Sequence, residues 1–227
     1  FKVEDRIIEY RLRQKGRLAS MNLYEFADEL ASDSPAPGGG SVSALNGVLS
    51  AGLSSMVGNL TYGKKGYQEV KDEMVSISEK GQVLKAFFLD AIDKDTEAFN
   101  KIMQAFAMPK SSEEEKKARE AAVQAATKEA TLVPFSVLEK TLEVVRLALA
   151  VAQKGNQNSL SDSGVAGLTA AAAAEGAMYN VMINLQGIED QEFKASLSKQ
   201  AIEIHRQVLE IAAETRNVLY KGLAINI

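Results

Sequence analysis

Hydrophobic residues recur at alternating steps of three and four along most of the chain, which is the spacing of one face of an α-helix. The longest such pattern runs from Tyr67 to about Phe106 and predicts a helix roughly 60 Å long. A heptad-like stripe with charged outer faces predicts a final helix from Asp190 to about Gly222. The sequence shows no strand-like alternation of useful length, so we expect an all-α fold, a multihelical bundle with long helices.

Capping residues predict where the other helices begin. The expected ranges are 22–30, 41–60, 112–131, 134–154 and 165–185. Asn22, Ser41 and Ser112 are the expected N-caps, and Ser112 forms a capping box with Glu115. Pro134 is expected in the first turn of its helix, because proline lacks the N–H group that a helix interior needs.

Residues 1–21 have no clean periodicity and predict a linker or docking arm ahead of a helical domain over residues 22–227. The charged N-terminus does not resemble a signal peptide. The chain begins with Phe1 rather than Met, so we expect it to be processed, trimmed or part of a longer protein.

No charged residue occurs in the thirty positions from Ser34 to Gly63. Serine, glycine and asparagine are too frequent there for a membrane span, which favours a helix buried on most sides. The long helix and the heptad seam carry more apolar surface than one small bundle can hide, which predicts a homodimer.

Composition narrows the chemistry. The chain has no cysteine and one histidine, which excludes thiolate metal sites and histidine clusters and predicts no metal. Its 26 Lys and Arg against 30 Asp and Glu do not suggest a nucleic-acid binder. Proton transfer then falls mostly to carboxylates, lysines, tyrosines or the backbone.

Asp95 stands in the apolar stripe of the long helix, between Ala91 and Phe99. A carboxylate facing a core needs a partner, so it is either in a structural salt bridge or cap, or a general acid–base whose pKa burial raises. Asp162 could be catalytic, although an N-cap is the simpler interpretation. His205 is expected to be an ordinary surface or half-buried histidine.

Two loops could bind a ligand. The segment Pro37-Gly38-Gly39-Gly40-Ser41 is either a tight loop or a cradle of backbone N–H groups for an anion or a polar ring edge. Lys64 and Lys65 either complement a helix C-terminus or bind an anionic substrate tail. Asn180 and Asn184, one turn apart, could hold a ring edge or cross-link two helices.

Five ordered blocks resemble the cyclodeaminase domain of formiminotransferase-cyclodeaminase over about residues 22–227. They are the segments 34–41, 56–65, 93–99, 155–162 and 180–185. The stretch 5–10 is similar to the connection that follows the transferase half of the bifunctional enzymes.

This resemblance implies an intertwined homodimer and a lyase of one-carbon metabolism and histidine degradation. It would cyclise 5-formimidoyltetrahydrofolate to 5,10-methenyltetrahydrofolate and release ammonia. The alternatives are a methenyltetrahydrofolate cyclohydrolase and a non-catalytic folate-binding scaffold. The family's motif makes Asp95 catalytic, and Asp162 is a second candidate. The expected substrate-binding residues are Pro37, Gly38, Gly39, Gly40, Ser41, Asn59, Lys64, Lys65, Tyr67, Asn158, Ser161 and Asn184.

The implied partners are a polyglutamylated tetrahydrofolate, a second copy of the chain, and a formiminotransferase domain in the same natural chain. The reaction requires no cofactor, and neither nucleic acid nor a membrane is an expected partner. The missing targeting signals and the folate chemistry together predict a cytoplasmic enzyme.

Overall fold

The computed structural model describes residues 18–225, and within that range it is all-α, as predicted. The α-helices are α2 (Leu23–Leu30), α3 (Gly39–Tyr62), α4 (Lys71–Phe106), α5 (Glu113–Lys154), α6 (Leu160–Gln186) and α7 (Gln191–Gly222). Two short 3₁₀ turns, η2 (Gln68–Val70) and η3 (Gln157–Ser159), precede α4 and α6. No strand occurs in the described part of the chain.

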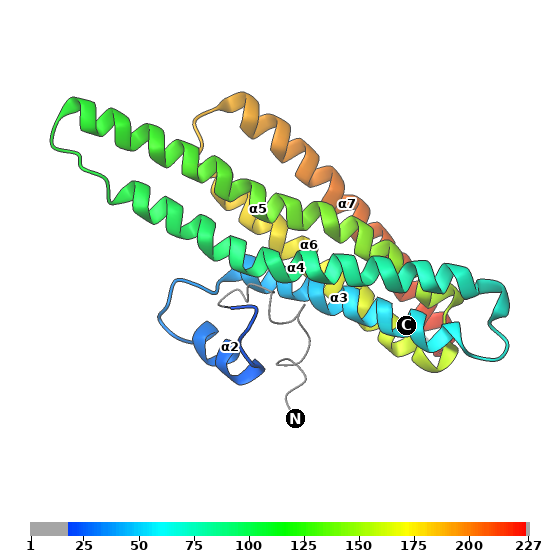
Figure 1. Ribbon diagram of the computed structural model, residues 1–227. Coiled ribbons are helices and arrows are strands. Elements are labelled where there is room, and N and C mark those ends of the chain that lie inside the picture. The colour runs from blue at the N-terminus through cyan, green and yellow to red at the C-terminus, as the bar shows by residue number, and fades with distance from the viewer. Residues whose placement is uncertain (1–17, 226–227) are drawn as a thin grey trace.

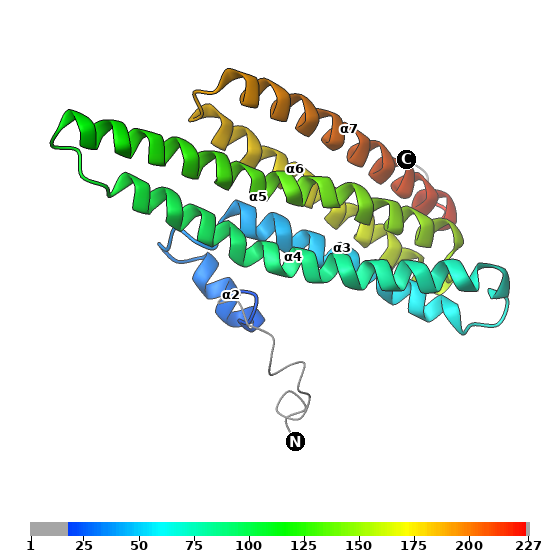
Figure 2. The same ribbon diagram turned by 45° about the horizontal axis from the view of Figure 1, so that its top comes forward.

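The five long helices form one elongated bundle, with α2 lying to one side (Figure 1). Helix α3 packs against α4, α5 and α6, and α7 packs against α5 and α6. Helices α4 and α5 run side by side in both views, and their connecting hairpin projects beyond the ends of α3 and α6 (Figure 2). The projecting hairpin leaves part of α4 and α5 without neighbours from the rest of the bundle.

The uncharged segment folds as a helix surrounded by others. Small residues let neighbouring backbones approach α3: a β-carbon at Gly47 would lie 2.6 Å from the Phe88 ring of α4. On the other side, the Ser50 hydroxyl donates to the Ala166 carbonyl of α6 at 2.8 Å. Among the helices between residues 18 and 225, none combines the length and apolarity of a bilayer span.

The prediction of two helices on either side of Pro134 was wrong, because α5 runs unbroken for 42 residues with Pro134 inside it. A proline there leaves the carbonyl four residues earlier, that of Ala130, without its usual helical donor. The side-chain amide of Asn184 on α6 donates to that carbonyl at 3.3 Å. A tertiary hydrogen bond therefore replaces the one that proline removes.

Other predicted helix starts moved by a few residues. Helix α3 begins at Gly39 with Gly38 as an N-cap that makes no side-chain bond, so Ser41 is not the cap. Helix α6 begins at Leu160 rather than Val165. The long helix begins at Lys71, because the chain first turns at Gly66, whose φ is +93°. Asn22 and Ser112 are the N-caps of their helices, as predicted. Both form a capping box, which was predicted only for Ser112.

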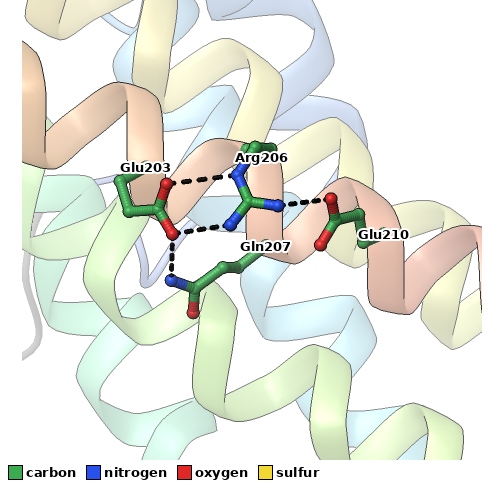
Figure 3. Close-up of polar contacts among 4 residues, drawn as sticks. All are labelled: Glu203, Arg206, Gln207 and Glu210. Carbon is green, nitrogen blue, oxygen red and sulfur yellow. Dashed lines mark hydrogen bonds and ion pairs between the residues drawn. The ribbon is translucent and has the colours of Figure 1, made fainter.

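Charged side chains on the outer face of α7 pair with one another. Arg206 binds both carboxylate oxygens of Glu203, at 2.7 and 3.1 Å, and also pairs with Glu210 (Figure 3). These side chains are exposed and lie on one helix, which confirms the charged outer face that the heptad pattern predicted. Each of these three charged side chains is more than half exposed.

Candidate functional site

The carboxylate of Asp95 meets the N-terminus of α3. Its Oδ2 accepts a hydrogen bond from the Ser41 hydroxyl at 3.0 Å, and the backbone N–H of Ser41 donates to the same carboxyl group. The Ser41 hydroxyl also lies 3.4 Å from the Ile92 carbonyl. Since the first N–H groups of a helix have no partner within it, Asp95 binds where α3 accepts negative charge.

Gly40 allows the Asp95 carboxyl to lie this close to the backbone of α3. A β-carbon there would lie 2.6 Å from the carboxyl carbon of Asp95, a distance that non-bonded carbon atoms do not adopt. The third glycine of the loop is therefore required by a carboxylate of the protein itself. Gly38 and Gly39 are more open: Gly38 caps the helix, and Gly39 is exposed.

Burial raises the pKa of the Asp95 carboxyl, and the two hydrogen bonds from Ser41 oppose this shift without cancelling it. The side chain is half-buried, so one side is held by α3 while part of the group remains accessible. A carboxyl in this state can donate a proton to a leaving group and accept one from an attacking group. This arrangement suits acid–base catalysis.

Helix α6 closes the other side of the glycine loop. A β-carbon at Gly39 would lie 3.4 Å from the Asn180 amide nitrogen, and Ser43 packs directly against Gly176. Asn180 donates to the Gly176 carbonyl at 2.8 Å, which leaves its amide oxygen directed away from that bond. Of the two amides weighed from sequence, Asn180 is the one beside the loop.

Asn184 was predicted either to bind substrate or to cross-link two helices, and its amide donates to the Ala130 carbonyl on α5, which links α6 to α5. The sequence contained a signal for this role, because Pro134 leaves a carbonyl in need of a donor. The donor could be identified only if α5 were known to pack against α6, and the spacing of residues along the chain does not reveal that packing.

We call the cluster of residues 37–41, Asp95 and Asn180 the Asp95 end. Most of the other predicted binding residues gather at the opposite end of α3, which we call the Lys64 end: residues 59–67 together with 156–162. There the Lys64 ammonium donates to the Asn156 side chain and lies 5.8 Å from the Tyr67 ring centroid. The Tyr67 hydroxyl accepts from the backbone N–H of Gln157 at 3.1 Å.

The remaining predicted residues of the Lys64 end are open to solvent. Asn59, Lys65, Asn158 and Ser161 are exposed, and Asp162 is half-buried. Asp162 lies in the first turn of α6, whose N-cap is Ser159, so the N-cap interpretation of Asp162 was wrong. Its carboxylate instead complements the positive end of the helix dipole. Polar groups and a cation thus surround a helix N-terminus.

The two ends lie far apart within one chain. Helix α3 has 24 residues, which corresponds to a length of about 36 Å. Helix α6 runs antiparallel beside it, since Asn180 adjoins Gly39 while Ala166 adjoins Ser50. Two groups at opposite ends of α3 cannot both touch the reacting atoms of one small substrate within a single chain.

Other titratable groups lie outside both ends. His205 is half-buried, as expected, and its Nε2 lies 2.5 Å from Glu175, which also accepts from the Tyr179 hydroxyl at 2.6 Å. These bonds, that of Tyr179 first, lower the pKa of Glu175. No group of three or more His, Cys, Asp or Glu side chains between residues 18 and 225 is arranged to hold a metal ion.

Several known proteins resemble the chain in sequence. It is 44% identical to the methenyltetrahydrofolate cyclohydrolase of Methylorubrum extorquens over 77% of this chain and 84% of that protein. It is 34% identical to the formimidoyltransferase-cyclodeaminase of Rattus norvegicus over 86% of this chain. The match spans 36% of the rat protein's length, so the chain corresponds to only part of that relative.

The fold also has a solved counterpart. The crystal structure of formiminotetrahydrofolate cyclodeaminase from Thermotoga maritima superposes with a TM-score of 0.82 at 33% identity, covering 90% of this chain and 98% of that one. The family model described as formiminotransferase-cyclodeaminase matches residues 22–203, which include both ends of α3. The resemblance inferred from the five sequence blocks is confirmed, and the chain belongs to the formiminotransferase-cyclodeaminase family.

Proposed function

We propose that the chain is a folate one-carbon enzyme that cyclises 5-formimidoyltetrahydrofolate to 5,10-methenyltetrahydrofolate, with Asp95 as the general acid–base. The observation that carries this proposal is the half-buried Asp95 carboxyl, fixed against the α3 N-terminus by Ser41 and Gly40. Family membership supports the folate substrate, and the names of the rat and Thermotoga relatives support the deamination.

The proposed reaction needs positioning and two proton movements. N10 attacks the formimino carbon, a carbon–nitrogen bond forms, and the proton of N10 passes through Asp95 to the former imine nitrogen. Protonation of the resulting amine lets ammonia leave and gives the methenyl cation, so one proton is consumed overall. No electrons are transferred, and the reaction as written uses no cofactor.

The second candidate reaction is hydrolysis of the methenyl compound, which the cyclohydrolase from Methylorubrum supports by its 44% identity over most of both chains. The same carboxyl would then accept a proton from the attacking water. A third possibility, a scaffold that binds folate without catalysis, has less support, because it gives no reason for a half-buried carboxyl with a raised pKa.

Turnover assays with both substrates test the proposal. Wild-type protein should produce methenyl absorbance from 5-formimidoyltetrahydrofolate, and Asp95→Asn should reduce the rate by about 10²–10⁴-fold with unchanged helical content. Loss of absorbance when 5,10-methenyltetrahydrofolate is the substrate would instead support the cyclohydrolase. Full activity of Asp95→Asn would remove Asp95 from the mechanism, and binding without turnover would favour the scaffold.

A homodimer is the second part of the proposal. Helices α3 and α6 pack against each other, and each carries large side chains along one of its own faces, between 47 and 63% exposed: Leu49, Leu60, Val165, Leu168, Tyr179 and Ile183. Helix α3 carries no charge that would oppose burial of this face. Two copies related by a twofold axis could cover it, as in an isologous interface.

Such a dimer would also bring the two ends together. With a twofold axis across the middle of α3, the Lys64 end of one copy would lie beside the Asp95 end of the other, which would account for binding groups so far from the carboxyl. A transferase domain ahead of this chain remains a prediction, because the cyclohydrolase and the bifunctional relatives both match the same helical part.

Mixed dimers test this assembly. Asp95→Asn and the double variant Lys64→Glu/Lys65→Glu should each be impaired alone. Statistical mixing gives dimers with one intact composite site, so activity should recover to about a quarter of wild type. Recovery no greater than the sum of the two parents would contradict a shared site, and a monomer in light scattering would contradict the dimer itself.

A further inference from the structure

A groove of about 450 Å³ lies where the projecting hairpin joins α4 to α5. The residues that matter in its lining are Phe106, Lys110, Lys116, Arg119, Glu120 and Gln124. Three of these are cationic and one is anionic, which gives the lining a net charge of +2. The groove is positive although the whole chain has a formal net charge of −4.

Two of the cations are not neutralised by the protein. Arg119 donates from Nε to the Phe106 carbonyl at 3.0 Å and stacks 5.5 Å from the centroid of its ring. No carboxylate in the described part of the chain pairs with Arg119, and Lys110 has no ion pair or hydrogen bond there. Lys116 is paired with Glu113. Arg119 is therefore held in place with its outer donors free.

The groove is aligned with the Asp95 carboxyl. Phe106 follows Asp95 by eleven residues, which is about three helical turns, so both side chains project from nearly the same face of α4 about 16 Å apart. Phe99 and Ile102 lie between them and are partly exposed, which gives an apolar surface along that face.

The other wall of the groove belongs to the same end of the bundle. Gln124 donates to the Gly187 carbonyl at 3.0 Å and accepts from the backbone N–H of Glu189 at 3.0 Å. These bonds fix the groove against the turn that follows α6, the helix that carries Asn180. The groove, the apolar surface and the Asp95 carboxyl are thus on one side of one chain.

We infer that this groove binds the outer γ-linked glutamates of a polyglutamylated folate whose reacting atoms lie at Asp95, an inference that rests on the proposed function. About 16 Å is within reach of an aryl amide followed by glutamyl residues. Each added glutamate presents one carboxylate, which Arg119 and Lys110 can bind through charge-assisted hydrogen bonds. The Phe106 ring can pack against the methylene groups between them.

This assignment differs from the sequence prediction, which gave the tail to Lys64 and Lys65. Within one chain those lysines lie at the other end of α3, and Lys64 already bonds to Asn156. In the proposed dimer the lysines of the second copy would lie beside the Asp95 end, where we expect them to contact the body of the substrate and not its outer glutamates. Three glutamates, Glu113 to Glu115, form the first turn of α5. Their negative charge would repel a densely charged polyanion such as nucleic acid, whereas a short tail whose carboxylates are spaced apart can still bind.

The test compares substrates that differ only in tail length. KM would be measured for monoglutamate and pentaglutamate forms with wild type, Lys110→Ala/Arg119→Ala and Lys64→Ala/Lys65→Ala. The matched control is Lys80→Ala/Arg146→Ala, which removes the same two kinds of cation from exposed sites on α4 and α5 away from the groove. The groove variant should raise KM for the pentaglutamate about tenfold or more and leave the monoglutamate within about twofold.

Lys110→Glu is a second variant that leaves the bonds between Arg119 and Phe106 intact, so its loss of tail preference cannot come from unfolding of the helix ends. Binding of a free tetra-γ-glutamyl peptide, measured by calorimetry, separates the failure of the proposed reaction from the failure of the proposed groove. If no folate is turned over but the peptide binds wild type and not the groove variant, the proposed reaction fails and the groove stands as a site for γ-glutamyl chains.

Equal losses for both tail lengths would overturn the inference. So would a tail-dependent loss that appears only in Lys64→Ala/Lys65→Ala. A groove variant that instead dissociates the dimer, with no change in peptide binding, would show that the groove contacts a second copy and not a ligand.

Discussion

The two ends of α3 differ in how their polar groups are held. At the Asp95 end, a carboxyl is packed between helices, and backbone groups complete its environment. At the Lys64 end, most candidate side chains are exposed on turns and on the first turn of α6. One end fixes a single titratable group, whereas the other offers several polar groups whose positions depend on loops.

This difference separates two tasks. A proton-transfer group benefits from burial, because burial shifts its pKa and fixes its position. Groups that bind a charged substrate can remain exposed until the substrate arrives. The contrast suggests that chemistry belongs to the Asp95 end and substrate binding is shared with exposed cations elsewhere, and each of the following variants can break or sharpen it.

Among these further variants, the largest expected effect comes from Gly40→Ala. Its new methyl group would overlap the Asp95 carboxyl and push it away from the α3 N-terminus. A displacement of about 1 Å can reduce the rate by about 10²-fold, so we expect a loss of that order in kcat with folding retained. Steady-state kinetics and circular dichroism would measure the two effects.

Gly52→Ala is the matched control, because it lies in the same helix and nothing within the chain is within 4 Å of its added β-carbon. Gly52 lies near the proposed twofold axis, so light scattering would check that this variant is still a dimer. Alanine there should keep activity and stabilise the helix by about 0.5–1 kcal/mol. Equal activity in the two variants would mean that the position of Asp95 does not matter, and the contrast between the ends would fail.

The sequence predicted much of this arrangement, for a physical reason. Helical stripes and caps depend on residues within a few positions of each other, so the all-α fold, the capped starts at Asn22 and Ser112 and the oddity of Asp95 were visible locally. The continuous α5 was not, because a partner on α6 compensates Pro134. Local rules correctly disfavour an internal proline and fail only when another helix supplies the donor.

Site residues were harder to place for the same reason. The glycine loop and the Lys64 turn lie close together in sequence, yet a helix of about 36 Å separates them. The role of Gly40 depends on α4, and the choice between Asn180 and Asn184 depends on which faces α3. The sequence gives no sign of the cationic groove, because Lys110 and Arg119 belong to a charged stretch of the kind that is normally only a solvated face.

A double-mutant cycle between Asn184 and Pro134 shows whether Asn184 is structural. Asn184→Ala leaves the Ala130 carbonyl without its donor and should destabilise the protein by about 1–3 kcal/mol. In a Pro134→Ala background, a backbone N–H replaces the amide, so the same substitution should cost less than about 1 kcal/mol. Urea unfolding of the four proteins gives the coupling.

Asn180→Ala serves as the comparison, because its amide bonds within its own helix, to Gly176, and should show no coupling to Pro134. If Asn184 instead proves uncoupled while its loss raises KM, it belongs to the substrate site as the sequence predicted. The Asp95 end would then have to extend further along α6.

The smallest expected effect is on the pH dependence of stability. Because burial raises the pKa of Asp95 above its ordinary value of 3.8, the folded protein holds this proton more tightly than the unfolded chain. The contribution of this group is fully present below pH 3.8 and is lost as pH rises through the raised pKa. Asparagine does not titrate, so Asp95→Asn should gain stability relative to wild type between pH 4 and pH 7.

Urea unfolding at both pH values and one protein concentration measures the change in stability. The control is Asp90→Asn, because Asp90 is exposed beside Lys94. A constant difference between Asp95→Asn and wild type would mean that Asp95 titrates as a solvated carboxylate, which would make the Asp95 end no more specialised than the Lys64 end.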